Sequence, residues 1–111
     1  MHLSDREITH LERFEDFPNI EVVWLNNNKL TNLDGLYHNF RIKNIYCTNN
    51  YLDNVEGLKK FKFLKLLYVE NNRLTGLDKF LKFMSRFAYI EYLNLSGNPL
   101  AEEPDYRLKV I

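Results

Sequence analysis

Hydrophobic residues recur along the chain in one pattern that is repeated four times. Each copy reads apolar-x-x-apolar-x-apolar-x-x-Asn-x-Leu, and the copies cover residues 20–30, 42–52, 64–74 and 90–100. The Asn residues that close the pattern lie 22, 22 and 26 positions apart: Asn28, Asn50, Asn72 and Asn98. A nearly fixed period over most of a chain indicates a solenoid, in which each repeat forms one coil that stacks on its neighbours.

The spacing within each copy predicts the elements of one coil. Two apolar residues with one residue between them, such as Val23 and Leu25, send their side chains to the same face of a strand. We therefore expect four short parallel strands centred near 23–25, 45–47, 67–69 and 93–95, and an incomplete strand near Leu3. Leucines then recur every three residues, which is typical of a 3₁₀ turn. In the longer third interval, apolar residues at helical spacing predict an α-helix within 78–87.

The recurring Asn requires a separate explanation. Where the chain turns inward after a strand, its backbone N–H and C=O groups are buried outside the sheet ladder. An Asn side chain can both donate to and accept from such groups, whereas Asp cannot donate and Leu can do neither. We therefore predict a structural ladder formed by the four Asn residues of the pattern.

The four aligned copies resemble the leucine-rich repeat family, and the 22-residue period is similar to that of its Sds22-like subclass. The resemblance implies an α/β solenoid with a short parallel β-sheet on the concave face and 3₁₀ or short α-helices on the convex face. It implies one domain over 1–111, with a partial repeat near 3–19 and further repeats at 20–41, 42–63, 64–89 and 90–111.

The end of the chain resembles the C-terminal cap that follows many intracellular repeats of this subclass. The cap resemblance is partial, and we expect the chain to be part of a longer protein. The matching positions are Asn98, Pro99, Leu100, Tyr106, Arg107, Val110 and Ile111.

Charge and cysteine content limit the classes of binding partner and the cellular compartment that the sequence favours. Fifteen Lys and Arg balance fifteen Asp and Glu, so no basic field favours direct binding to nucleic acid. No apolar run is long enough to cross a membrane, and the first residues lack the features of a signal peptide. The single cysteine, Cys47, occupies an apolar position of the repeat and is expected to be buried. A cytoplasmic location is predicted.

The sequence offers little of the chemistry that an enzyme requires. The three histidines fall at different phases of the repeat, so the periodicity does not stack them as metal ligands. The serines lack a nucleophile-elbow context, and no glycine-rich phosphate loop is present. We expect no catalytic activity, no cofactor or metal, and no small-molecule substrate.

The positions that the repeat leaves free are the candidate binding residues, because they face outward from the strands. An aromatic stripe there would form a contiguous surface, and aromatic residues dominate binding hot spots. Alternatively, the rings stabilise the sheet by cross-strand contact without a partner. The flanking charges carry both signs, which favours a protein partner. The candidates are Trp24, Tyr46, Tyr68, Tyr92 and Asn94, bracketed by Glu21, Lys43, Lys65 and Glu91.

The resemblance implies a non-enzymatic protein-interaction module that binds a protein partner on its concave face, within a larger complex. Among relatives the chain looks most like cytoskeletal and axonemal members, which suggests a place in a cilium or flagellum. Two other settings stay open: a scaffold subunit of an RNA–protein particle, where the concave face grips a helix of a protein, and a phosphatase-regulatory repeat protein, which requires a longer array.

Overall fold

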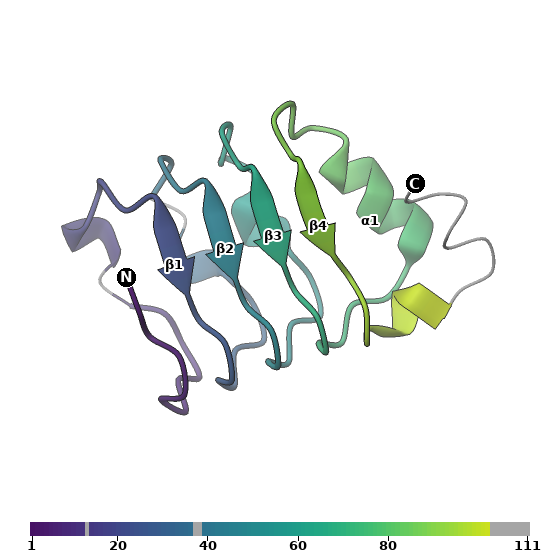
Figure 1. Cartoon of the computed structure of the whole chain (residues 1–111), viewed down its shortest axis with the longest axis horizontal. Coiled ribbons are helices and arrows are strands. Elements are labelled where there is room, and N and C mark those ends of the chain that lie inside the picture. Colours follow the sequence, from purple (N-terminus) through teal and green to yellow (C-terminus); the bar gives the residue numbers. More distant parts are fainter. Residues whose placement is uncertain (13, 37–38, 103–111) are drawn as a thin grey trace.

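Four short parallel strands form a single sheet in the order of the sequence. The computed structural model describes residues 1–12, 14–36 and 39–102. The strands are β1 (Val22–Trp24), β2 (Asn44–Tyr46), β3 (Leu66–Tyr68) and β4 (Tyr92–Asn94), and each pairs in parallel with the next (Figure 1). The predicted solenoid with a parallel sheet is confirmed. Each strand lies one residue earlier than the sequence pattern predicts.

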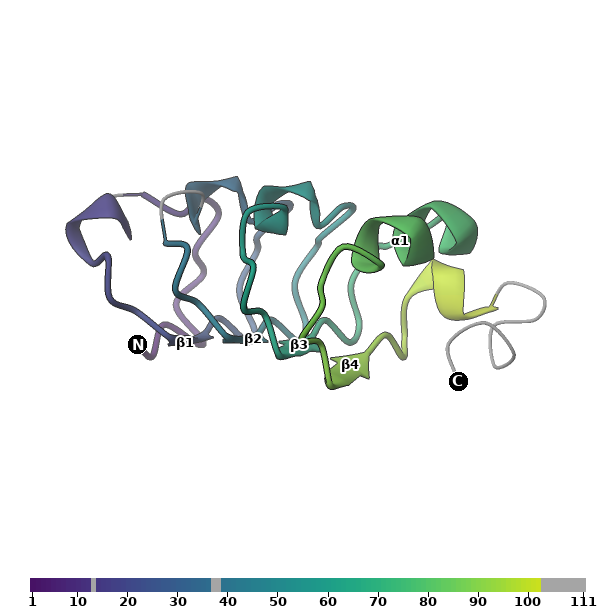
Figure 2. The same ribbon diagram turned by 90° about the horizontal axis from the view of Figure 1, so that it is seen from above.

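Helical segments return the chain on the opposite side from the sheet (Figure 2). They are 3₁₀ turns except in the longer third coil, where the segment is an α-helix: η1 (Phe14–Asp16), η2 (Asp34–Leu36), η3 (Glu56–Leu58), α1 (Leu77–Met84) and η4 (Pro99–Glu102). The helix α1 begins one residue before the predicted range and ends three residues before its end. It ends there because the chain turns after Ser85, where the Phe87 N–H donates to the Met84 carbonyl.

The core lies between the sheet and the helical side. It consists of the inward residue of each strand and the apolar residues that follow, such as Val23, Leu25 and Leu30, which have no exposed surface. The 3₁₀ turns η2 and η3 stack closely, and Gly57 is required there because a Cβ would lie 2.8 Å from the backbone nitrogen of Asp34. The repeat therefore supplies both the apolar residues of the core and the glycine that lets η2 and η3 stack closely.

The predicted incomplete strand near Leu3 appears as a single bridge. His2 pairs in parallel with Trp24, the Leu3 N–H donates to the Trp24 carbonyl, and the N-terminal amine donates to the Val22 carbonyl. Residues 1–5 thus occupy the open side of β1. At the other end, the cap positions Asn98, Pro99 and Leu100 are described, whereas Tyr106, Arg107, Val110 and Ile111 lie outside the described residues.

The four Asn side chains join each coil to the coil before it. Asn50 illustrates the arrangement: its Nδ2 donates to the Leu25 carbonyl of the preceding coil at 2.9 Å, and its Oδ1 accepts from the Leu30 N–H at 3.1 Å. Asn28, Asn72 and Asn98 make equivalent bonds to their preceding coils. All four are almost completely buried.

Within the described ranges, the structure contains no helix with the length and apolar character that a membrane span requires.

Candidate partner-binding surface

The outward side chains of β1 to β4 form two columns across the sheet, and we call this surface the sheet face. Residues at the two ends of each strand point outward while the middle residue is buried in β1, β2 and β3. The strand register places Trp24, Tyr46, Tyr68 and Asn94 in one column. It places Val22, Asn44, Leu66 and Tyr92 in the other.

The first column is a continuous row of rings. Trp24 and Tyr46 stack with centroids 5.5 Å apart, and Tyr46 and Tyr68 meet edge to face at 5.6 Å. The rings shield one another, so each of the three is half-buried rather than fully exposed. Such rigid, partly desolvated rings bind a partner at low entropic cost, because few rotamers remain to be frozen.

The second column is less uniform. Tyr92 is 52% exposed and lies beside Leu66, so it widens the apolar surface next to the aromatic row without extending that row. The Oδ1 of Asn44 is buried and has no hydrogen-bond partner among the described residues. An unpaired buried acceptor carries a cost that a shift of the side chain toward a donor would relieve.

The charged residues that precede the strands form two ion pairs. Lys43 Nζ lies 2.9 Å from Glu21 Oε1, and Lys65 Nζ lies 3.8 Å from Glu91 Oε2. The four side chains are each more than half exposed, so water screens the pairs and they add little to stability. They leave the upper border of the sheet face with balanced charge.

Sequence reasoning missed three features of the surface. His2 stacks on Trp24 with centroids 4.0 Å apart and extends the aromatic row; the signal was its position 22 residues before Trp24. An exposed ladder of Asn27, Asn49 and Asn71 runs below the row, with side-chain bonds of 2.7 and 2.9 Å. All three adopt positive φ, which Asn tolerates better than most residues. The third missed feature is a group of exposed aromatics in the loops before the strands.

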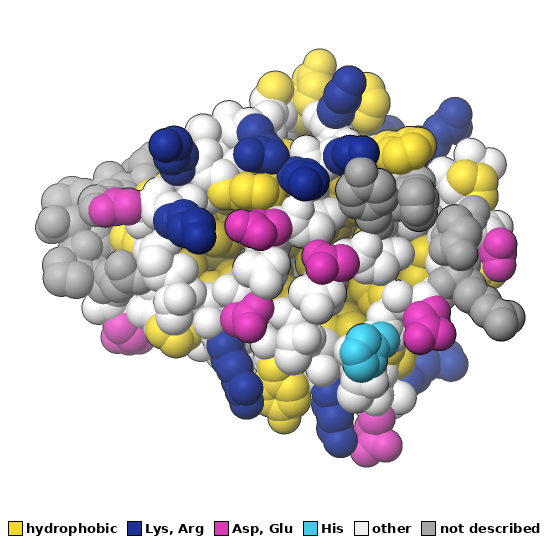
Figure 3. Space-filling view, turned by 180° about the vertical axis from the view of Figure 1, so that it is seen from behind, with side chains coloured by type: hydrophobic (Ala, Val, Ile, Leu, Met, Phe, Trp, Pro, Cys, Tyr) yellow, Lys and Arg dark blue, Asp and Glu magenta, His cyan; other side chains and the backbone are white. Residues whose placement is uncertain are grey.

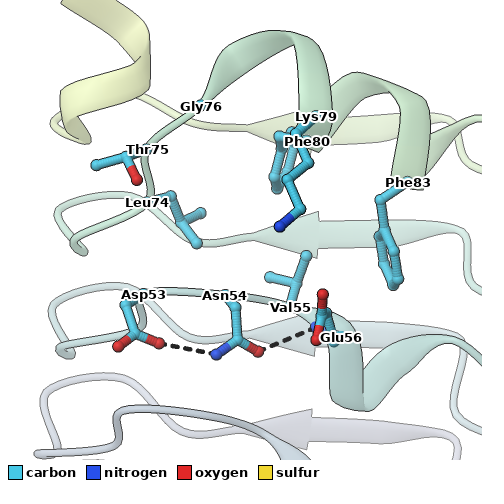
Figure 4. A pocket seen from close by; sticks show the side chains of 10 residues that line it. All are labelled: Asp53, Asn54, Val55, Glu56, Leu74, Thr75, Gly76, Lys79, Phe80 and Phe83. Carbon is cyan, nitrogen blue, oxygen red and sulfur yellow. Dashed lines mark hydrogen bonds between the residues drawn. The ribbon is translucent and has the colours of Figure 1, made fainter.

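A hollow of about 230 Å³ lies between α1 and the preceding coil on the helical side (Figure 4). Phe80 and Phe83 reach into it from α1, and Asp53 and Glu56 approach from the coil below. Asn54 joins the two acidic residues by donating to Asp53 Oδ1 and accepting from the Glu56 N–H. The hollow is bordered on one side by α1, the helix of the longer third coil.

The described part of the chain holds no group of three or more His, Cys, Asp or Glu residues placed to bind a metal ion. Cys47 is buried in the core, and burial raises the pKa of its thiol from 9.0 to about 12. The thiol therefore stays protonated and unreactive at neutral pH.

Comparisons with known proteins agree with this architecture. The family model for the leucine-rich repeat matches residues 89–109. A comparison with curated proteins finds no match.

Solved structures share the fold over most of the chain. A chain from the crystal structure of the Drosophila melanogaster SNF/U2A′ complex is 28% identical, with a TM-score of 0.83, and the match covers 96% of this chain and 62% of that one. Internalin C2 from Listeria monocytogenes is 16% identical, with a TM-score of 0.79, over 95% of this chain and 47% of that one. Internalin InlF from the same species is 20% identical, with a TM-score of 0.74, over 83% and 26%. The chain thus spans less than two thirds of each of these structures.

Proposed function

We propose that this leucine-rich repeat protein is a non-enzymatic interaction module whose sheet face binds a protein partner. The observation that carries the proposal is the aromatic row of His2, Trp24, Tyr46 and Tyr68, which presents stacked rings on one side of a rigid sheet. Repeat solenoids use such a face for recognition because its outward residues vary without affecting the core.

The chemistry of the face favours a partner segment with both apolar and polar groups. Tyr46 and Tyr68 offer ring faces and hydroxyls, and Leu66 and Tyr92 extend the apolar area beside them. The border charges include both signs, Glu21 with Lys43 and Lys65 with Glu91, so a nucleic acid backbone would meet carboxylates as well as amines. A protein helix or loop of mixed charge fits this border.

Two settings for the complex are proposed. Resemblance of the repeat motif supports a structural role in a cytoskeletal or axonemal assembly of a cilium. Likeness to the chain from the SNF/U2A′ complex supports the alternative, a scaffold subunit of an RNA–protein particle that contacts a protein. Affinity purification from ciliated and non-ciliated cells distinguishes them, because an axonemal partner is recovered only from the ciliated cells.

Substitution of two rings tests the binding face. Tyr46→Ala with Tyr68→Ala should weaken the partner complex by at least ~2 kcal/mol, about thirtyfold, because hot-spot residues cost this much or more when truncated. The fold should persist, since neither ring belongs to the core. Tyr51→Ala is the matched control, because Tyr51 is 41% exposed but lies past the turn that follows β2.

The measurement is quantitative mass spectrometry of proteins retained by the wild type and by each variant, followed by titration of the recovered partner at two salt concentrations. A partner retained equally by the wild type and the double variant, with a steep dependence on salt, would place the contact elsewhere and refute the proposal.

A further inference from the structure

Exposed aromatic side chains gather along the edge where the strands begin, in the loops that lead into β1, β2, β3 and β4; we call this the strand-entry edge. Six large hydrophobic side chains of the described residues are more than 40% exposed, and four of them lie here. They are Phe17, Phe40, Phe63 and Tyr89, exposed by 50–59%. The rings of Phe63 and Tyr89 are in contact, with centroids 5.9 Å apart. Scattered exposed aromatics are ordinary, but a row of them marks an interaction surface.

The middle of this edge is hollowed and strongly basic. Phe40 and Phe63 line a surface hollow of about 490 Å³ together with Lys59, Lys60 and Lys62. An adjoining hollow of about 400 Å³ is lined by Phe63 with Asn19, Glu21, Arg41 and Lys43. The two hollows thus present five cationic side chains and one carboxylate. Figure 3 shows Lys and Arg side chains with hydrophobic side chains between them along this upper edge.

We propose that the strand-entry edge is a second docking surface, which takes an acidic segment of a protein that carries a bulky apolar side chain. The apolar side chain enters the hollow between Phe40 and Phe63, where ring contact adds to burial of apolar surface. Carboxylates beside it meet the ammonium groups of Lys59 and Lys62 on the rim of the hollow. This surface shares the border residues Glu21 and Lys43 with the sheet face, but its main hollow is lined by other residues, so it goes beyond the function proposed above.

The charge pattern favours an acidic protein segment over other anionic partners. Glu21 and Glu91 stand on the same edge, outside the central lysines, so a continuous phosphate backbone would run onto carboxylates at both ends. A bilayer surface attracts an extended basic patch but provides no protruding group to fill a hollow, and this chain has zero net charge. A short peptide with localised acidic charge and one apolar anchor matches both the extent and the shape of the site.

The test begins with selection of random peptides of about 12 residues, displayed on phage, against the purified full chain. We expect the enriched peptides to carry net negative charge and at least one large apolar residue. Synthetic copies of these peptides are then titrated against the protein by fluorescence anisotropy at low and moderate salt.

Two pairs of substitutions probe the apolar and the charged components separately. Phe40→Ser with Phe63→Ser, and Lys59→Glu with Lys62→Glu, should each weaken peptide binding at least about tenfold, which corresponds to about 1.4 kcal/mol. All four side chains are exposed, so the melting temperature should change little. The matched control is Tyr51→Ser with Lys29→Glu, which changes an exposed aromatic and an exposed lysine past the turns that follow β2 and β1.

The outcomes separate the proposal from its rivals. The proposal is supported if acidic peptides are enriched, and if these peptides bind the control variant normally but bind neither test variant. Enriched peptides without negative charge, equal binding by the wild type and the Phe variant, or no enrichment would overturn it. A further result would also overturn the proposal: the peptides fail to bind, while oligouridylate or phosphatidylserine vesicles bind the wild type and not the two test variants. Tyr46→Ala with Tyr68→Ala should leave binding of the acidic peptides unchanged. The proposal for the strand-entry edge and the proposal for the sheet face can therefore be refuted independently.

Discussion

From the Asn ladder we predict that Asn72→Asp lowers the free energy of unfolding by an amount that depends on pH. Asn72 is 7% exposed; its Nδ2 donates to the carbonyls of Cys47 and Val69, both at 2.9 Å, and its Oδ1 accepts from the Leu52 N–H at 2.9 Å. Asn72→Asp keeps the shape and the acceptor but replaces the donor by a second oxygen. At neutral pH that oxygen would be a charged group facing the carbonyl oxygens of Cys47, Val69 and Glu70, the last of which accepts from Nδ2 at 3.1 Å. The Glu70 carbonyl keeps its bond from the Asn49 N–H.

The magnitude follows from the groups that lose partners. The Val69 carbonyl retains its bond from Asn98, whereas the Cys47 carbonyl keeps only a 3.4 Å bond from Asn50. A buried carbonyl left with one long hydrogen bond costs up to about 1–3 kcal/mol, and an uncompensated buried charge raises the loss to about 3–5 kcal/mol at pH 7. This is a large share of the stability of a small domain.

The loss should shrink in acid. The environment raises the pKa of the introduced carboxyl in the folded state above its unfolded value of about 3.9. A raised folded pKa means that the folded chain holds the proton more tightly, so the variant gains stability relative to the wild type as pH falls toward the unfolded value. Near pH 4 the protonated carboxyl can donate to one carbonyl, and the loss should fall to about 1–2 kcal/mol.

Urea denaturation followed by circular dichroism, at pH 7 and pH 4, measures both numbers. With a slope of about 2 kcal/mol/M, a loss of 4 kcal/mol moves the midpoint by about 2 M. Asn72→Leu should lose about 1–3 kcal/mol at both pH values, because it introduces no charge. Asn19→Asp, at an exposed turn position, should change by less than about 0.5 kcal/mol. A pH-independent loss for Asn72→Asp, or one no larger than that of Asn19→Asp, would refute the role assigned to the Nδ2 donor.

Other substitutions test the core, the stacking and the first coil. With the pKa of Cys47 raised to about 12, iodoacetamide at pH 8 should label it only as urea unfolds the chain, and prompt labelling of the native chain would contradict its burial. Between pH 9 and pH 12 the unfolded chain loses this proton first, so the stability advantage over Cys47→Ala should decline there as pH rises. Gly57→Ala should cost about 1–3 kcal/mol in urea titration, because its Cβ would meet the backbone of η2, whereas Thr75→Ala, at an exposed position, should be nearly neutral. His2→Ala should shift the emission of Trp24, the single tryptophan, to longer wavelength by uncovering its ring, and an unchanged spectrum, or an equal shift in His10→Ala, would argue against the stack.

The coil architecture could be predicted from the sequence because one pattern encodes it in every repeat. Buried positions such as Leu25 and Leu52 carry the period directly, and the strands were displaced by only one residue. The displacement arises because β1 ends at the outward residue Trp24. The next inward residue, Leu25, lies just after the strand, although its N–H still donates to the Tyr46 carbonyl.

The surfaces were less predictable, because they depend on how neighbouring coils place side chains. Phe40 and Phe63 are 23 residues apart and do not share a repeat position, so the repeat pattern did not predict that they line the same hollow. Tyr92 was grouped with the aromatic row, yet the register puts it beside Leu66. The half-burial of Tyr46 between two rings could not be predicted from the sequence either. A sequence pattern distinguishes outward from inward side chains, but it does not show which outward side chains are shielded by their neighbours.

The hydrogen bonds of the Asn ladder reach no farther than the adjacent coil, and this has a consequence for how such a chain can change length. Asn50 bonds to the carbonyl of Leu25 and Asn72 bonds to the carbonyl of Cys47, in each case through Nδ2 and at the same offset of 25 residues. A tandem duplication of residues 42–63 would therefore give the new coil a complete set of neighbours and would leave every existing bond with an equivalent partner. Closed sheets and globular cores lack this property, because an inserted unit displaces contacts throughout the molecule. The architecture can thus grow by gene duplication in single steps, each of which yields a folded product and a longer face.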